Sequence, residues 1–400
     1  MSQVRRALGL GVALVLCGAT AARAQQSFRA IWGSGPANIW AVGDGGTAVH
    51  FDGQAWTPVS FGLPVTNSFA AVWGSGPNNM FVGGEGLVLR WNGQAWAETQ
   101  GLTGRTIVGL VGRSATQVYT LAQSYSDTEA PTLLTWNGRA WTPTSLPMPF
   151  RANALALSGA TVLVAGFAMH DPTPNQRRTY GVLARRVAAR WVMAGWNGRA
   201  VTDRAVAAAG WSFVGAAGTA ILLSGENEEG ERVLALSRGA AFTALPTAGG
   251  SGNRVAAAFL ASDGVPVAFL GEAGLARYVR GAWAVTSPQS SAGVGLNPQQ
   301  MMQAAQNPMA YVVRQAAWGD LGSTLAAWGP SNDFHAVTQQ GRIIRVHADT
   351  AQIVYDAACA NPQMAAVNPI CQALQGQGAT PALQTPRPPL PMPSIRVKRP

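Results

Sequence analysis

Histidine, cysteine and acidic residues are scarce in this chain. Its 400 residues include 4 His, 3 Cys and 18 Asp and Glu, and charged residues of both signs make up only 12%. None of the histidines has the H-x-x-x-H or H-x-H spacing that ligates zinc; they are His50, His170, His335 and His347. The sequence therefore predicts no metal site, and nothing in it indicates a cofactor.

Four of the 18 acidic residues cluster in one stretch, "GENEEGE", which contains Glu226, Glu228, Glu229 and Glu231. We interpret it as a solvated hairpin tip, with a cation site as the alternative. A glycosidase needs two carboxylates across one pocket, and this clustering does not indicate such a pair. The chain also has no nucleophile elbow, phosphate-binding loop or dinucleotide fingerprint. We predict that the protein is not an enzyme, and keep a sialidase- or lyase-type enzyme as an alternative.

Long apolar runs are absent beyond the N-terminal residues, so we expect no transmembrane helix. At the start, Arg5 and Arg6 precede an apolar run that ends at Cys17, and the small-x-small triplet 22–24 follows. This pattern is typical of a secretory leader. We predict a signal peptide over residues 1–24, cleavage after Ala24, and a periplasmic or extracellular protein. A lipoprotein modified at Cys17 is the alternative, which the large Leu16 before it disfavours.

The positive charge lies mostly outside the expected folded body. The formal net charge of +10 falls to +7 when Arg5, Arg6 and Arg23 leave with the leader. It falls to about +3 without the four cations of the last 22 residues. Basic residues of the body show no clustering with aromatic residues along the sequence. We therefore do not predict nucleic-acid binding.

Two cysteines remain after the leader, Cys359 and Cys371. An even pair in an oxidising compartment predicts one disulfide, and two buried thiols are the alternative. The bond would staple a separate C-terminal segment, residues 358–378.

Glycine and tryptophan are abundant, with 47 Gly and 14 Trp, and a unit of sequence recurs. The stretch "IWGSGPANIWAVGDGGTAVHFDGQAW" at 31–56 returns as "VWGSGPNNMFVGGEGLVLRWNGQAW" at 72–96. Each copy predicts four short strands, which in the first copy are 28–33, 38–42, 47–51 and 55–59. The "DG" and "NG" pairs predict tight turns between the third and fourth strands.

Fainter copies continue to residue 357, with fourth-strand markers at Trp56, Trp96, Trp141, Trp191, Phe242, Trp283 and Val354. Four-stranded repeats of about 40 residues are typical of propeller blades. We predict an all-β fold, a β-propeller of seven four-stranded blades over residues 25–357. Six or eight blades, or a linear β-solenoid, are the alternatives. The recurrent tryptophans are interpreted as structural: Trp32, Trp56, Trp73, Trp96, Trp141, Trp283 and Trp328.

Two segments do not fit a blade. A partly helical, methionine-rich insertion is expected at about 287–318, where Met301, Met302 and Met309 form a candidate partner-binding patch. The second segment is the Pro-rich tail 379–400, expected to sample extended polyproline II. Its cations are candidate docking residues: Arg387, Arg396, Lys398 and Arg399. A packed loop and a flexible spacer are the respective alternatives.

The stretch "IWAVGDGGTAVHFDGQAWTPV" resembles the bacterial propeller repeats of the photosystem II stability/assembly factor type. The match is good in the first two copies, partial in the last and weak between them. The stretch is also similar to the Asp-box repeats of sialidase-type propellers, but the residue between Asp52 and Gly53 of that box is missing. The resemblance implies a seven-bladed scaffold for protein contact or assembly.

We therefore expect an exported, non-enzymatic propeller that binds an envelope or extracellular protein. Propellers present variable loops on a rigid ring, so binding residues are expected on those loops. A carbohydrate-binding, lectin-like propeller is a second alternative beside the enzyme.

Overall fold

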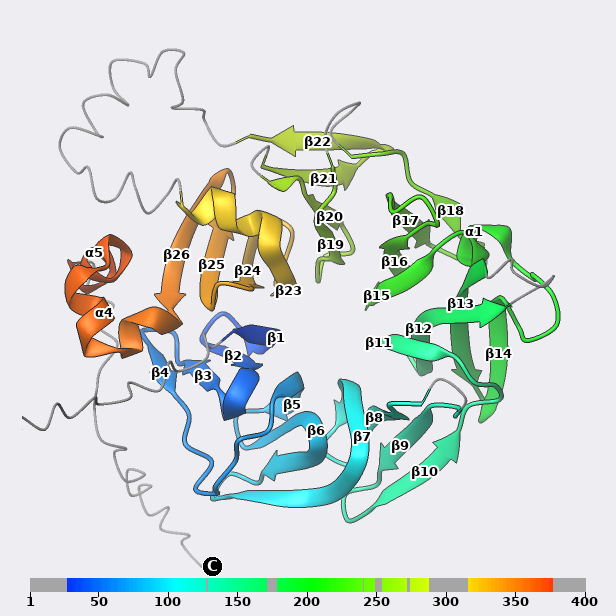
Figure 1. Cartoon of the computed structure of the whole chain (residues 1–400), viewed down its shortest axis with the longest axis horizontal. Helices are drawn as coiled ribbons and strands as arrows, with labels where there is room; N and C mark the ends of the chain where they lie inside the picture. The colour runs from blue at the N-terminus through cyan, green and yellow to red at the C-terminus, as the bar shows by residue number, and fades with distance from the viewer. Residues whose placement is uncertain are drawn as a thin grey trace, which may run out of the picture.

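The structure is a computed structural model that describes residues 27–126, 129–170, 178–239, 241–248, 254–271, 274–287 and 316–376. Strands make up most of it and form a ring of β-sheets (Figure 1). The predicted all-β propeller is confirmed. The insertion methionines and the cations of the tail lie outside the described residues.

The first repeat unit forms an antiparallel sheet in chain order, β1 (Phe28–Gly35), β2 (Asn38–Gly43), β3 (Ala48–Phe51) and β4 (Trp56–Pro58). These bounds agree with the predicted strands to within two residues. The "DG" turn forms because the Asp52 carboxylate accepts hydrogen bonds from the amides of Gln54 and Ala55. Asn92 and Asn137 hold the equivalent turns of units two and three in the same way. Asn197 holds a turn of the same kind after β14, in the connection to unit five. Gly53 has φ of 97°, a conformation that glycine adopts without strain.

The second and third units share one six-stranded sheet, so the described residues form six sheets. This agrees with the six-blade alternative rather than with the preferred count of seven separate blades. Its strands are β5 (Phe69–Gly76), β6 (Asn79–Trp91), β7 (Trp96–Ser114), β8 (Gln117–Ser124), β9 (Thr132–Trp136) and β10 (Trp141–Ser145). The units merge because Glu85 of β6 pairs with Thr106 of β7. β6 and β7 therefore run as continuous strands through the segments that form loops in the other units. Six separate sheets thus contain seven repeat units.

The four remaining sheets each contain one unit. Unit four comprises β11 (Arg151–Ser158), β12 (Thr161–His170), β13 (Arg178–Val187) and β14 (Arg190–Gly195). Unit five comprises β15 (Gly210–Ala217), β16 (Ala220–Glu226), β17 (Arg232–Ser237) and β18 (Thr243–Ala244). Unit six comprises β19 (Ala257–Leu260), β20 (Pro266–Phe269), β21 (Leu275–Val279) and β22 (Ala282–Thr286). Unit seven comprises β23 (Thr324–Trp328), β24 (Asp333–Thr338), β25 (Arg342–His347) and β26 (Thr350–Asp356).

Short helices lie in the connections. They are η1 (Asp44–Gly46), α1 (Arg204–Ala207), η3 (Leu321–Ser323), η4 (Ala357–Ala360), α4 (Pro362–Val367) and α5 (Pro369–Gly376). The last three follow β26 and lie outside the ring beside the seventh unit (Figure 1).

The hydrophobic core lies between the sheets. Seven clusters of buried apolar side chains occupy the spaces between neighbouring repeat units in the described structure. One of them joins Phe28 and Ile39 of the first unit to Val337 and Tyr355 of the seventh. The ring therefore closes by packing of side chains, and burial of apolar surface between units stabilises it.

Tryptophans at the ends of inner strands pack on glycines of the next unit. The Trp328 ring lies so close to Gly33 that an added Cβ would be 2.8 Å from it, and at Gly112 an added Cβ would be only 2.5 Å from the Trp73 ring. Trp56, Trp73, Trp96 and Trp141 are buried, whereas Trp32, Trp283 and Trp328 are partly buried. The recurrent tryptophans thus pack within the sheets and between neighbouring units.

Candidate partner-binding surface

All units point the same way, so the ring has two distinct faces. In an antiparallel meander, the turn between strands one and two lies at the same sheet edge as the turn between strands three and four. Neighbouring units align, because Ser158 Oγ donates to the Gly218 carbonyl, which joins equivalent turns of units four and five. Ser331 likewise donates to Asp263 between units seven and six. We call this side the hairpin face and the opposite side the connection face.

Six arginines lie on the hairpin face of units three to five. Arg113 precedes the first turn of unit three, and Arg139 lies in its last turn. Arg185, Arg186 and Arg190 flank the turn between β13 and β14. Arg238 follows the end of β17. We call this set the arginine face: Arg113, Arg139, Arg185, Arg186, Arg190 and Arg238.

None of these six guanidinium groups pairs with a carboxylate of the described residues. Arg113, Arg139, Arg190 and Arg238 are exposed, and Arg185 and Arg186 are partly exposed. Arg186 donates to the hydroxyl of Thr135 in the neighbouring unit. The described surface therefore holds their positive charge uncompensated.

The described acidic residues of units three to five lie on the other side of the ring. They occupy the turns between second and third strands or the connections between units, and are Glu129, Asp203, Glu226, Glu228, Glu229 and Glu231. This separation leaves the arginine face with charge of one sign. A surface of that kind attracts a negatively charged partner and raises its association rate.

Arginine rather than lysine supplies this charge. The whole chain contains a single lysine, Lys398. A guanidinium group has five donors in a planar fork and binds carboxylates in a bidentate manner. The arginine face is therefore suited to carboxylate groups held several residues apart on a partner.

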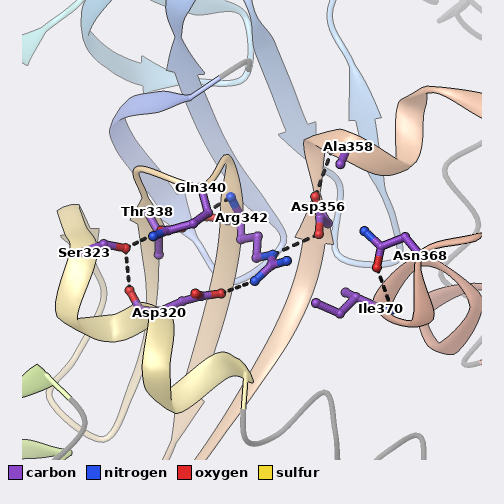
Figure 2. Close-up of polar contacts among 9 residues, drawn as sticks. All are labelled: Asp320, Ser323, Thr338, Gln340, Arg342, Asp356, Ala358, Asn368 and Ile370. Carbon is purple, nitrogen blue, oxygen red and sulfur yellow. Dashed lines mark hydrogen bonds and ion pairs between the residues drawn. The ribbon is translucent and has the colours of Figure 1, made fainter. Parts of the chain in front are cut away.

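A second charged cluster lies in the seventh unit, and its groups satisfy one another (Figure 2). Arg342 donates through Nε to Asp356 at 2.9 Å and through Nη1 to Asp320. The other Asp356 oxygen accepts from the amide of Ala358, 2.9 Å away. Ser323 donates to the carbonyl of Asp320 and contacts the side chain of Gln340.

Electrostatics support a structural role for this cluster. Burial disfavours the charged form of Arg342, but the hydrogen bonds that it donates to Asp320 and Asp356 outweigh burial and raise its pKa. Burial and the charge of Asp356 raise the pKa of Tyr355 to about 12. The cluster therefore joins the segment before β23 to β25 and to the start of η4, and holds the end of the ring together.

The structure brings together the predicted cysteine pair. Cys359 in η4 and Cys371 in α5 form a disulfide with Cα atoms 5.4 Å apart. Both residues are buried and pack with Ile370 and Leu374 against the core between units six and seven. The bond thus fastens α4 and α5 to the ring beside the Arg342 cluster.

The histidines have separate, local roles. His50 Nε2 lies 2.7 Å from the side-chain oxygen of Asn38 in the first unit, and Arg90 Nε donates to Asn79 at the equivalent position of the second. His335 takes the place of Trp40 in the seventh unit and is buried, with 8% of its surface exposed. Among the described residues, no three His, Cys, Asp or Glu side chains are close enough to hold a metal ion.

Sequence reasoning missed the arginine face. Its members are spread over more than 120 positions, and no short motif contains them. The sequence did contain a signal for it, because each of the six arginines lies in or next to the first or the last hairpin turn of its unit. Assigning each arginine to a turn class, rather than counting neighbours along the chain, would have revealed the cluster.

No helix among the residues that the structure describes is long and apolar enough to cross a membrane. No protein-family model and no curated protein sequence matches the chain. Solved structures do match. "YCF48 bound to D1 peptide" is 11% identical with a TM-score of 0.53, over 82% of this chain and 93% of that one. "YCF48 from Cyanidioschyzon merolae" is 15% identical with a TM-score of 0.50, over 81% and 96%.

The extracellular domain of a putative hybrid two-component system, BT4673 from B. thetaiotaomicron, is 11% identical with a TM-score of 0.51. The match covers 83% of this chain and 38% of that one. At these identities the similarity concerns the fold, and it confirms the resemblance found in the sequence at that level. The chain is a β-propeller similar in structure to these proteins.

Proposed function

We propose that this chain is an exported, non-enzymatic propeller that binds a protein partner through the arginine face. The observation that carries the proposal is the set of six arginines from three units, unpaired with any described carboxylate, on the face away from the described acids. The partner supplies an acidic segment, whose carboxylates accept hydrogen bonds from several guanidinium groups at once.

Two features support export. The first 24 residues have the pattern of a cleavable leader. The Cys359–Cys371 bond is of the kind that persists in oxidising compartments. A protein partner is further supported by analogy, because a propeller of similar fold is described with a bound peptide.

The test is photo-cross-linking in cell-envelope fractions followed by mass spectrometry. Amine-directed reagents are unsuitable, since the chain has one lysine. We would place a photoactivatable residue at position 114, next to Arg113, and in a control protein at position 229 on the connection face. We expect one protein to cross-link in stoichiometric amounts from position 114 only, with acidic residues in the cross-linked peptide.

Three variants separate the possible contact surfaces. Arg113→Ala/Arg139→Ala/Arg190→Ala should abolish the cross-link, whereas Arg178→Ala/Arg199→Ala/Arg204→Ala, with the same charge change on the connection face, should keep it. Removal of residues 379–400 should also keep it. Loss only with the tail would place the contact there. A cross-link to an acidic glycan, or none from position 114, would contradict the proposal.

A further inference from the structure

A cleft of about 500 Å³ lies between units four and five at the connection face, on the side of the ring opposite the arginine face. Asn153, Phe167 and Thr179 line it from unit four. Gly210, Ser212, Glu226, Glu228 and Arg232 line it from unit five. A space of this size accepts one or two side chains of a peptide or a small ligand.

Most donors that line the cleft are already used, and Arg232 Nε is a buried donor without a partner among the described residues. Arg232 donates through Nη1 to Ser212 and through Nη2 to the carbonyl of Ala256, and Nη2 lies 3.1 Å from Glu226 Oε1. Ser212 donates to the carbonyl of Ser224. The Asn153 amide nitrogen donates to the carbonyl of Trp211 at 2.9 Å.

The free polar atoms are mainly acceptors. The side-chain oxygen of Asn153, the second oxygen of Glu226 and the carboxylate of Glu228 receive no hydrogen bond from the described residues. Because Glu226 neutralises Arg232, the remaining charge of the lining is the single negative charge of Glu228. The Phe167 ring adds an apolar wall, which is also a suitable face for a cation.

We propose that this cleft binds a cationic side chain, an arginine or lysine of an extended peptide. A group rich in N–H donors and positively charged satisfies the three acceptors, and its aliphatic stem packs on Phe167. The site is independent of the arginine face, takes the opposite charge and opens on the opposite side of the ring. Its peptide has two sources, the basic residues of this chain's own tail and those of another protein.

The probe is a fluorescent peptide with the sequence of residues 385–400, and the readout is fluorescence anisotropy. The control peptide has glutamine in place of its four cations. The protein is the full chain after the leader, compared with a full chain that carries Arg387→Gln/Arg396→Gln/Lys398→Gln/Arg399→Gln. We expect saturable binding of the probe to this tail variant and at least about tenfold weaker binding of the control peptide.

Two cleft variants locate the binding. Glu226→Gln/Glu228→Gln removes the carboxylates, and its matched control is Glu85→Gln/Glu229→Gln, which removes two carboxylates outside the lining. Gly210→Val keeps every charge but fills the cleft, because a Cβ at Gly210 would lie 3.5 Å from Phe167 and Thr179. Both cleft variants should weaken binding by about tenfold or more, with the control pair unchanged. Thermal melting of each variant checks that the ring is intact.

Each outcome is decisive. If the tail occupies the cleft in its own chain, the tail variant binds the probe more tightly than the wild type. Equal affinities assign the cleft to another protein's cation. No binding of the probe to the tail variant would overturn the proposal. Binding that Gly210→Val leaves unchanged would also overturn it, since the peptide would then contact the acidic turn at residues 226–231 without entering the cleft.

Discussion

Individual side chains at unit boundaries set how the ring responds to acid. His335 is buried against Phe51 and Trp56 of the first unit, with ring centroids 6.3 Å and 6.1 Å away. Burial, and to a smaller degree the charge of Arg345, lowers its pKa to about 4, against a weaker opposite effect of Asp333. The neutral imidazole therefore belongs to the folded state at physiological pH.

The wild-type protein should lose stability between about pH 6.5 and about pH 4, because the unfolded chain takes up a proton at His335 there and the folded chain does not. A shift of this size corresponds to about 3 kcal/mol. His335→Phe should reduce the difference in the free energy of unfolding between about pH 7 and about pH 4.5 by about 2 kcal/mol, since these two values span most of the window; urea unfolding measures it. A difference in His335→Phe equal to that of the wild type would show that His335 does not cause it.

Glycines that face tryptophan rings allow neighbouring units to pack closely. Gly112→Ala would place a Cβ 2.5 Å from the Trp73 ring, whereas Gly35→Ala meets nothing within 4 Å. We expect the first change to cost about 1 to 3 kcal/mol through overpacking. Gly35→Ala should be close to neutral or slightly stabilising. Chemical denaturation of both proteins checks this, and equal midpoints would refute tight packing of Trp73 on its neighbour.

At the scale of elements, the C-terminal helices are held to the ring by the disulfide and by the Arg342 cluster. The disulfide closes a separation of 12 residues, so Cys359→Ser/Cys371→Ser should cost about 3 kcal/mol at most. Protease digestion should cut within α4 and α5 faster in this variant than in the oxidised wild type. Reduced wild type should behave like the variant, and unchanged digestion would show that packing alone holds the segment.

The buried ion pair gives a separate prediction. Asp356→Asn keeps the shape of the side chain but removes its charge. Asp320 is then the only carboxylate of the cluster that pairs with Arg342. We expect a loss of about 2 kcal/mol in the free energy of unfolding. Asp52→Asn is the matched control, since asparagine already holds the equivalent turn at Asn92. If both changes had the same effect in urea unfolding, the Arg342 cluster would not be a structural anchor.

Strands and turns of the first unit could be predicted because they depend on local sequence: glycine, Asp52 and alternating apolar residues. Fusion of units two and three could not, since it depends on pairing of Glu85 with Thr106 in place of a loop. The cysteine pair was predictable because two cysteines remain after the predicted leader and an exported protein is expected to oxidise them. The cleft was not, because its lining comes from residues 153–232 on two sheets that only the ring brings together.

At the scale of the whole molecule, the ring separates charge between its two faces over units three to five. Six arginines without a described carboxylate partner occupy the hairpin face, whereas the described carboxylates of these units share the connection face with other arginines, among them Arg178, Arg199 and Arg204 (Figure 1 shows the ring in which these units lie). Such a molecule can hold two segments of opposite charge at once, one on each side. This arrangement suits a scaffold, which gains affinity from several modest contacts rather than from one deep pocket.

The most direct test is the dissociation constant of the cross-linked partner for the wild type and for Arg113→Ala/Arg139→Ala/Arg190→Ala. We predict that the variant binds at least about tenfold more weakly. Wild-type binding should also weaken as NaCl rises from about 0.1 M to about 1 M, which shortens the Debye length from about 10 Å to about 3 Å. Equal dissociation constants for the two proteins, with no effect of salt, would contradict a partner held by the arginine face.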